Sequence, residues 1–215
     1  MLHHTKRHII WVFALFLMAC HTNTPTLDQP SAMQKSAKRG VSFDFKKIDD
    51  LPLLSPSVSW SYNWGNSQNA TAALWFDTNQ MDFCPMCWNN SYSADKIRQY
   101  VQEHPNTKYL LGFNEPNLTD QCNMTPTQAA EHWPQVVALA KELNLLLISP
   151  AMNYGTLAGY HDPIKWLDEF FAQPNVSLDD IHAIAIHCYM ASPKAVKNYI
   201  NNQKGDLADS PTSDS

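Results

Sequence analysis

Six short apolar or alternating segments are spaced along residues 40–187, and stretches with helical periodicity lie between them. The expected strands cover residues 40–43, 58–64, 80–86, 109–113, 145–149 and 181–187. The segments at 109–113 and 145–149 are apolar throughout, which is typical of parallel strands buried on both faces. Strands that alternate with helices predict an α/β fold with a parallel sheet.

Capping signals mark four of the helices. They are expected to begin after Ser93, Thr125, Asp162 and Ser192. Residues 125–128 form a capping box with proline at the first helical position. That helix is expected to run to about Leu143 with a kink near Pro134, and the last helix can end at Gly205.

The strand–helix alternation makes a (β/α)₈ barrel the leading architecture. Six strands are expected, however, and such a barrel has eight. Residues 206–215 are polar and carry no strand pattern. We therefore expect an incomplete TIM-barrel-like domain over residues 39–205, followed by a disordered tail at 206–215.

The first twenty residues have the pattern of an export signal. Lys6 and Arg7 precede an apolar run at 9–19, which is shorter than the roughly 20 residues needed to cross a bilayer. The run ends at Cys20 and resembles the lipobox of bacterial lipoproteins, although a buried structural cysteine is the alternative. The resemblance implies a signal peptide at 1–19 and a diacylated Cys20 on a flexible tether over 20–38. It also implies anchoring at the outer membrane or cell surface.

Composition narrows the class of ligand. Charged residues make up 16% of the chain, and the formal net charge is −5 with no long basic run. A nucleic-acid groove needs a positive stripe, so no nucleic-acid partner is expected. Neutral polar residues and aromatic residues together suit hydroxyl-rich neutral ligands such as sugars.

A carboxylate follows the apolar strand at 109–113. Asn114 and Glu115 stand where the strand ends, and a carboxylate there is costly unless it has a function. Glycoside hydrolysis needs a carboxylic acid to protonate the leaving oxygen, and a neighbouring amide can hold a sugar hydroxyl. A surface turn is the alternative, because both residues are also common in turns.

Several segments, in order along the chain, resemble the catalytic domain of glycoside hydrolase family 128. They are residues 38–41 (KRGV), 60–64 (WSYNW), 83–88 (FCPMCW), 110–117 (LLGFNEPN), 121–126 (QCNMTP), 149–151 (SPA) and 187–189 (HCY). The resemblance implies an endo-acting β-1,3-glucan hydrolase with a retaining mechanism and no cofactor. Its partner would be a β-glucan polysaccharide or oligosaccharide.

The resemblance also implies roles for individual residues. Glu115 would be the general acid/base, and Asn114 would bind the sugar 2-hydroxyl. The cleft would be lined by Trp60, Tyr62, Asn63, Trp64 and Trp88, with Asn123 in the loop after the acid/base strand and His187 and Tyr189 at the floor. From the residues alone, an aromatic strand is more often part of a core than a binding platform, and only about half of its aromatic side chains can face the barrel interior.

One expected catalytic group has no counterpart. The family's nucleophile is a Glu in a Trp-x-Thr-Glu-Phe-like segment on the seventh strand, and no such segment occurs here. Asp44 and Asp82 lie near other strands. We therefore expect a C-terminally truncated family member that does not hydrolyse glucan as written. The alternatives are an enzyme completed by a separate chain and a non-catalytic cell-surface β-glucan-binding lipoprotein.

Four cysteines remain besides Cys20, namely Cys84, Cys87, Cys122 and Cys188. All are expected near strand ends on the active face. They are compatible with disulfides, with free thiols or with a thiolate zinc site. Because there is no second C-x₂-C pair, no metal is expected.

Overall fold

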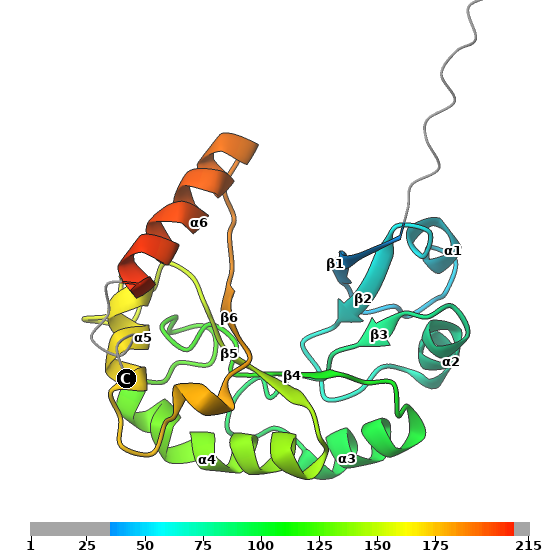
Figure 1. Ribbon diagram of the computed structural model, residues 1–215, viewed down its shortest axis with the longest axis horizontal. Coiled ribbons are helices and arrows are strands. Elements are labelled where there is room, and N and C mark those ends of the chain that lie inside the picture. The colour runs from blue at the N-terminus through cyan, green and yellow to red at the C-terminus, as the bar shows by residue number, and fades with distance from the viewer. Residues whose placement is uncertain (1–34, 209–215) are drawn as a thin grey trace, which may run out of the picture. The chain divides into compact units, whose positions relative to one another are not determined.

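The computed structural model describes residues 35–208, with side chains as far as residue 202. The strands are β1 (Ser36–Ser42), β2 (Val58–Tyr62), β3 (Asp82–Phe83), β4 (Tyr109–Leu111), β5 (Leu146–Met152) and β6 (Ala183–Ile186). The helices are α1 (Leu51–Leu54), α2 (Ala70–Thr78), α3 (Ala94–Glu103), α4 (Pro126–Glu142), α5 (Pro163–Phe171), the 3₁₀ helix η1 (Leu178–Asp180) and α6 (Pro193–Ala208). Figure 1 shows this order.

The strands form two three-stranded parallel sheets, β1-β2-β3 and β4-β5-β6. An isolated parallel bridge between Met86 and Leu111 joins them. There the Leu111 N–H donates to the Pro85 carbonyl at 2.9 Å, and the Cys87 N–H donates to the Leu111 carbonyl at 2.8 Å. The predicted α/β class with parallel strands is confirmed. Within residues 35–208 the sheets do not close on themselves, because β1 and β6 are end strands.

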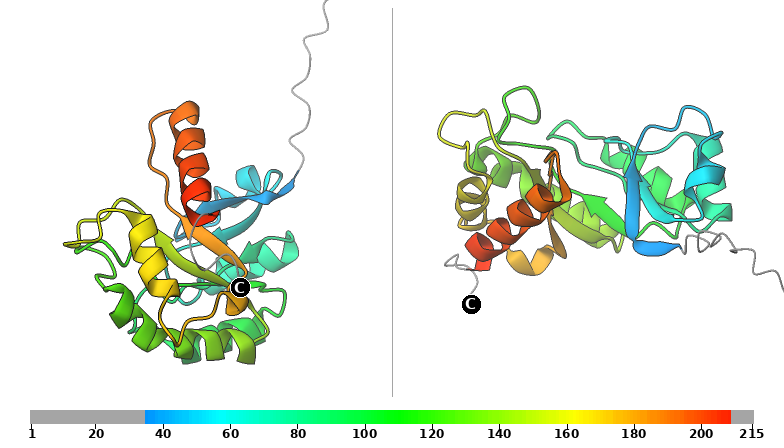
Figure 2. Two further views of the ribbon diagram at one scale, coloured as in Figure 1. Left: turned by 60° about the vertical axis from the view of Figure 1, so that its left-hand side comes forward. Right: turned by 90° about the horizontal axis from the view of Figure 1, so that it is seen from above.

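Helices pack on one face of each sheet (Figure 2). A core packs α3, α4 and α5 against β4 and β5, and it includes Leu110 of β4, Trp133 of α4 and Phe170 of α5. A second core packs α2 against the first sheet around Phe76 and Phe83. The opposite face of the strands is left free of these helices.

Local capping explains where the helices begin. The Ser93 hydroxyl accepts a hydrogen bond from Lys96 N at 3.3 Å, and Asp162 Oδ1 accepts one from Ile164 N at 2.9 Å. At α4 the capping box is complete, since Thr125 and Gln128 each bond the other's backbone N–H. The predicted starts of α3, α4 and α5 are confirmed, and Pro134 lies inside α4.

Two element boundaries differ from expectation. β1 begins at Ser36, inside the expected tether, because Ser36 N donates to the Ser57 carbonyl and Ser59 Oγ donates to the Ser36 carbonyl. α6 continues past Gly205 to Ala208, since a helical glycine weakens a helix by about 1 kcal/mol without ending it. The tail therefore does not begin at 206.

The third strand also differs. It covers two residues, because α2 occupies 70–78 and was not expected, and Gln80 follows the helix end with φ 54°. The expected signal peptide, Cys20 and residues 209–215 lie outside the described residues. None of the helices within residues 35–208 is long and apolar enough to cross a membrane.

Candidate active site at the carboxyl ends of the strands

A hollow of about 460 Å³ lies on the strand face turned away from the helices. Alternation along β4 places Leu110 in the helix-covered core and Tyr109 and Leu111 on the hollow. Trp60 and Tyr62 of β2 share the lining, as do Ile184, Ile186 and His187 at β6. The hollow is therefore largely apolar and aromatic, with His187 at the carboxyl end of the strands.

Glu115 stands at that end, just past β4. Its backbone N–H donates to the Ala151 carbonyl at 2.9 Å, and its φ is 45°. The side chain is 7% exposed. Its Oε1 lies 2.7 Å from His187 Nδ1 and 3.2 Å from the Tyr189 hydroxyl. An ionised carboxylate can only accept hydrogen bonds, so in that form both groups donate to the same oxygen.

The charge of Glu115 affects the pKa values of two phenols, those of Tyr189 and Tyr62. Although the Tyr189 residue is 71% exposed, partial burial of its phenol raises the pKa of Tyr189 to about 12, with further contributions from the Glu115 charge and hydrogen bond. Burial also raises the pKa of Tyr62, the Glu115 charge adds to this, and a hydrogen bond with Ser42 opposes it. Both phenols are therefore protonated donors at neutral pH.

Asn114 is buried beside Glu115. Its backbone N–H donates to the Trp88 carbonyl at 2.9 Å, and its Nδ2 donates to Gln121 Oε1 at 3.0 Å. Its Oδ1 has no hydrogen-bond partner among the described residues. A buried amide oxygen without a partner is costly and is ready to accept a hydroxyl. Gln121, which fixes the amide, was not singled out from the sequence.

The predicted aromatic residues divide into two groups. Trp60 and Tyr62 line the hollow, and the Trp64 ring meets Tyr62 edge-on with 5.3 Å between centroids. Trp88 is half-buried, and it is not among the described residues that line the hollow. Asn63 uses both side-chain polar atoms inside its own loop, so a role in stabilising the loop is the direct reading.

The remaining predicted position, Asn123, is exposed at φ 52° in the loop before α4. The structure therefore brings together Asn114, Glu115, His187 and Tyr189. Asn123 makes no contact with that group.

A residue missed at the sequence level joins two of the loops. Asn117 is fully buried, and its Nδ2 donates to the carbonyls of Asn153 at 2.7 Å and Tyr160 at 3.3 Å. Its own carbonyl accepts the N–H groups of Thr156 and Leu157. The loop after β4 is thereby tied to the loop after β5. Its place in the LLGFNEPN segment was the available signal.

The four cysteines described by the structure are free thiols. Burial raises the pKa of Cys84 and Cys122 to about 12 and also raises that of Cys87, so these groups are protonated at neutral pH. Within residues 35–208 no group of three or more metal-ligating side chains is present. A metal bound by these cysteines would require their thiolate forms, which burial disfavours.

The two other candidate carboxylates are engaged elsewhere. Asp44 pairs with Lys46, with 2.5 Å between Oδ2 and Nζ. Asp82 pairs with Lys108 at 2.7 Å and lines a separate hollow near the start of β4. Neither side chain is a hydrogen-bond partner of Glu115.

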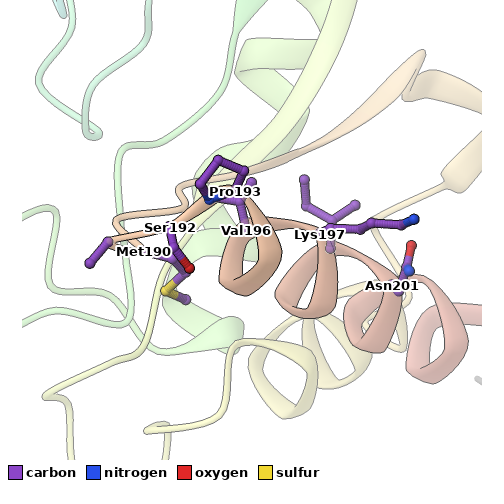
Figure 3. A pocket seen from close by; sticks show the side chains of 8 residues that line it. Met190, Ser192, Pro193, Val196, Lys197 and Asn201 are labelled. Carbon is purple, nitrogen blue, oxygen red and sulfur yellow. The ribbon is translucent and has the colours of Figure 1, made fainter.

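A further hollow, of about 640 Å³, runs along the first turns of α6. Figure 3 shows the side chains of Met190, Pro193, Val196, Lys197 and Asn201 there. Its lining is apolar apart from a few polar groups at the edge, and it holds none of the predicted site residues.

Comparisons with known proteins agree with this geometry. A family model described as glycosyl hydrolase catalytic core matches residues 40–210. The chain is 36% identical to a subgroup II endo-β-1,3-glucanase of glycoside hydrolase family 128 from Pseudomonas viridiflava. The TM-score is 0.69, and the match covers 80% of this chain and 68% of that one. No curated protein sequence gave a significant match.

Two further solved structures are similar. The family's subgroup II enzyme from Sorangium cellulosum is 31% identical, with a TM-score of 0.69 and coverage of 79% of this chain and 70% of that chain. A subgroup I endo-β-1,3-glucanase from Amycolatopsis mediterranei, in complex with laminaritriose and laminaribiose, is 25% identical, with a TM-score of 0.56 and coverage of 79% and 65%. The chain therefore belongs to glycoside hydrolase family 128.

Proposed function

We propose that this chain binds β-1,3-glucan and that Glu115 is the general acid/base of a retaining hydrolysis site. One observation carries the proposal. The buried Glu115 carboxylate is bonded by Tyr189 and by His187, which lines the aromatic hollow. It directly follows Asn114, whose buried amide oxygen has no partner among the described residues. The similar enzymes from Pseudomonas and Sorangium are endo-β-1,3-glucanases, which supports the substrate class.

Each group has a chemical task in this proposal. Glu115 protonates the leaving glycosidic oxygen and later accepts a proton from water. Asn114 Oδ1 accepts a sugar hydroxyl, and the faces of Trp60, Tyr62 and Trp64 stack on sugar rings. His187 and Tyr189 both contact Glu115 Oε1 and hold the carboxyl group in place.

Retaining chemistry requires a second carboxyl group about 5–5.5 Å from the acid/base. The Trp-x-Thr-Glu-Phe-like segment expected to carry that group does not occur in this sequence. We therefore propose that this polypeptide by itself binds glucan without hydrolysing it. In the same proposal its six strands belong to a (β/α)₈ barrel architecture.

A non-catalytic cell-surface β-glucan-binding lipoprotein is the second candidate, and the aromatic hollow favours it. Lipid attachment at Cys20 and an outer-membrane or cell-surface location belong to this proposal too. Their support is the sequence of residues 1–21 alone.

The test combines binding and turnover on the same purified protein. Laminarihexaose binding is measured by calorimetry, and reducing ends released from laminarin are counted, for the wild type and for Glu115→Gln. Glu131→Gln, an exposed carboxylate on α4, is the matched control. We expect binding by all three proteins and no release of reducing ends.

The other outcomes are equally decisive. Release of reducing ends that falls by about 10²–10⁴-fold in Glu115→Gln would support the acid/base role and overturn the expected inactivity. Release that Glu115→Gln leaves unchanged would remove Glu115 from the mechanism. Failure of the wild type to bind laminarihexaose would overturn the proposed function.

A further inference from the structure

Trp64 has a backbone conformation that tryptophan rarely adopts. It lies two residues past the end of β2 with φ 61°, in the left-handed region that favours glycine. Two other residues with positive φ, Gln80 and Asn144, directly follow the caps of α2 and α4, where this conformation commonly ends a helix. Trp64 follows a strand, so helix termination does not account for it.

Two asparagine side chains hold the loop around Trp64. Asn63 Nδ2 donates to the Ser67 carbonyl at 3.1 Å, and Asn63 Oδ1 accepts the Gly65 N–H at 3.0 Å. The loop is thus closed on itself on both sides of Trp64. We call residues 63–67 the Trp64 loop.

The second asparagine ties the Trp64 loop to its neighbours. Asn66 Nδ2 donates to the Met86 carbonyl at 2.9 Å, and Asn66 Oδ1 accepts the Ser93 N–H at 3.0 Å. The Gly65 carbonyl also accepts the Met86 N–H at 2.9 Å. An unfavourable backbone conformation persists where the surroundings over-determine it, and these bonds do so.

The indole held by the loop does not fill the core. Trp64 is 42% exposed, and its ring contact is the edge-on one with Tyr62. Tyr62 lines the hollow, and the Glu115 charge contributes to the raised pKa of its phenol. The strained residue therefore extends the aromatic lining outward from the acid/base carboxylate.

We propose that the Trp64 loop pre-organises the indole as a sugar-stacking platform, and that Asn63 and Asn66 are positioning residues for glucan binding. The proposal rests on the proposed function. A ring already fixed in its binding orientation loses less conformational freedom when the ligand arrives. The free-energy cost of this pre-organisation is present in the unbound protein as backbone strain at Trp64.

Two substitutions at one position separate the strain from the stacking. Trp64→Ala and Trp64→Gly both remove the indole, and only glycine is relaxed at this φ. We expect both variants to weaken laminarihexaose binding by at least 10-fold and to a similar extent. Trp64→Gly should nonetheless melt about 2–4 °C above Trp64→Ala.

The positioning role is tested by combining variants. Asn66→Asp keeps the acceptor for Ser93 N and loses the donor to the Met86 carbonyl. It should weaken binding several-fold when Trp64 is present and should have no further effect in the Trp64→Gly background. Asn79→Asp is the matched control, because Asn79 Nδ2 likewise donates to a backbone carbonyl, that of Trp75, at the end of α2. It should leave binding unchanged.

Contrary results are distinguishable. If the wild type binds and Trp64→Gly binds equally well, the platform is wrong while the proposed function stands. If Trp64→Gly and Trp64→Ala have the same melting temperature, the proposed backbone strain at Trp64 is wrong. If Asn66→Asp weakens binding equally in both backgrounds, Asn66 does not act through Trp64. If the wild type does not bind, the proposed function and the platform both fail.

Discussion

Glu115 and His187 are 72 residues apart in the sequence, and 2.7 Å separates Glu115 Oε1 from His187 Nδ1. The contact exists because β4 and β6 flank β5 in one parallel sheet, so their carboxyl ends lie at the same edge. Both side chains are largely buried, at 7% and 14% exposure. A pair shielded in this way should be energetically coupled.

That coupling can be measured in a double-mutant cycle of Glu115→Gln and His187→Ala. We expect an interaction free energy of about 0.5–3 kcal/mol, because Glu115→Gln removes the carboxylate charge from this contact and His187→Ala removes the imidazole. Denaturant unfolding of the four proteins gives the value. The control pair, Asp120→Asn with His187→Ala, should be additive, since Asp120 is exposed. Additivity in the Glu115 cycle would show that the contact contributes nothing.

The Tyr189 phenol should make the fold sensitive to alkaline pH. Its pKa is raised from 10.0 to about 12, so the folded protein holds the phenolic proton more tightly than the unfolded chain does. Its stabilising contribution is complete below about pH 10 and is lost as the pH rises toward 12. Thermal melting across this range should show a smaller loss for Tyr189→Phe than for the wild type. Superimposable profiles would contradict the assignment.

Asn117 should be important for stability because it ties two loops together. Asn117→Ala leaves the carbonyls of Asn153 and Tyr160 without their donor, which we expect to cost about 1–3 kcal/mol. In a protein of this size that lowers the melting temperature by about 2–4 °C per kcal/mol. Asn90→Ala, which removes an exposed amide, should change it little. Equal melting temperatures for the two variants would disprove the role of Asn117.

Gly112 lies where β4 and β5 approach closely. A Cβ there would sit 2.8 Å from the Ile148 carbonyl oxygen and 2.9 Å from Ser149 backbone atoms, which cannot rotate away. Gly112→Ala should therefore destabilise the protein by about 1–3 kcal/mol. Gly159→Ala tests the opposite case, because its Cβ would meet no atom within 4 Å and only its φ of 86° opposes the change. Chemical denaturation should rank Gly112→Ala below Gly159→Ala in stability.

Much of the fold could be predicted because its signals are local. Thr125 and Asp162 indicate where α4 and α5 begin, because each caps its helix by bonding a residue two or three positions away. α2 has a local cap too, since Asn69 Oδ1 accepts the Ala72 N–H, but it has no apolar stripe. Its apolar residues 72–76 are consecutive and point in all directions, so Phe76 is buried while Leu74 is 67% exposed. Without an apolar stripe, the helix could not be told from a strand or loop.

The site was predictable in part for the same reason. Asn114 and Glu115 stand out because they end an apolar strand. Their partners were reached only through the family resemblance, since no spacing rule links Glu115 to a histidine 72 residues away. Asn63 shows the opposite difficulty, because an amide that shapes a loop and an amide that binds a sugar look identical in sequence.

The left-handed residues have a consequence for protein engineering. Among the described non-glycine residues with positive φ, Gln80 and Asn144 end helices, whereas Trp64, Glu115 and Asn123 lie in the loops after strands. Glycine is the usual replacement when such positions are chosen to raise thermostability. At Gln80 and Asn144 that choice touches no proposed function. At Trp64 that choice would relieve the backbone conformation and remove the proposed sugar platform. A stability screen alone would not detect that loss.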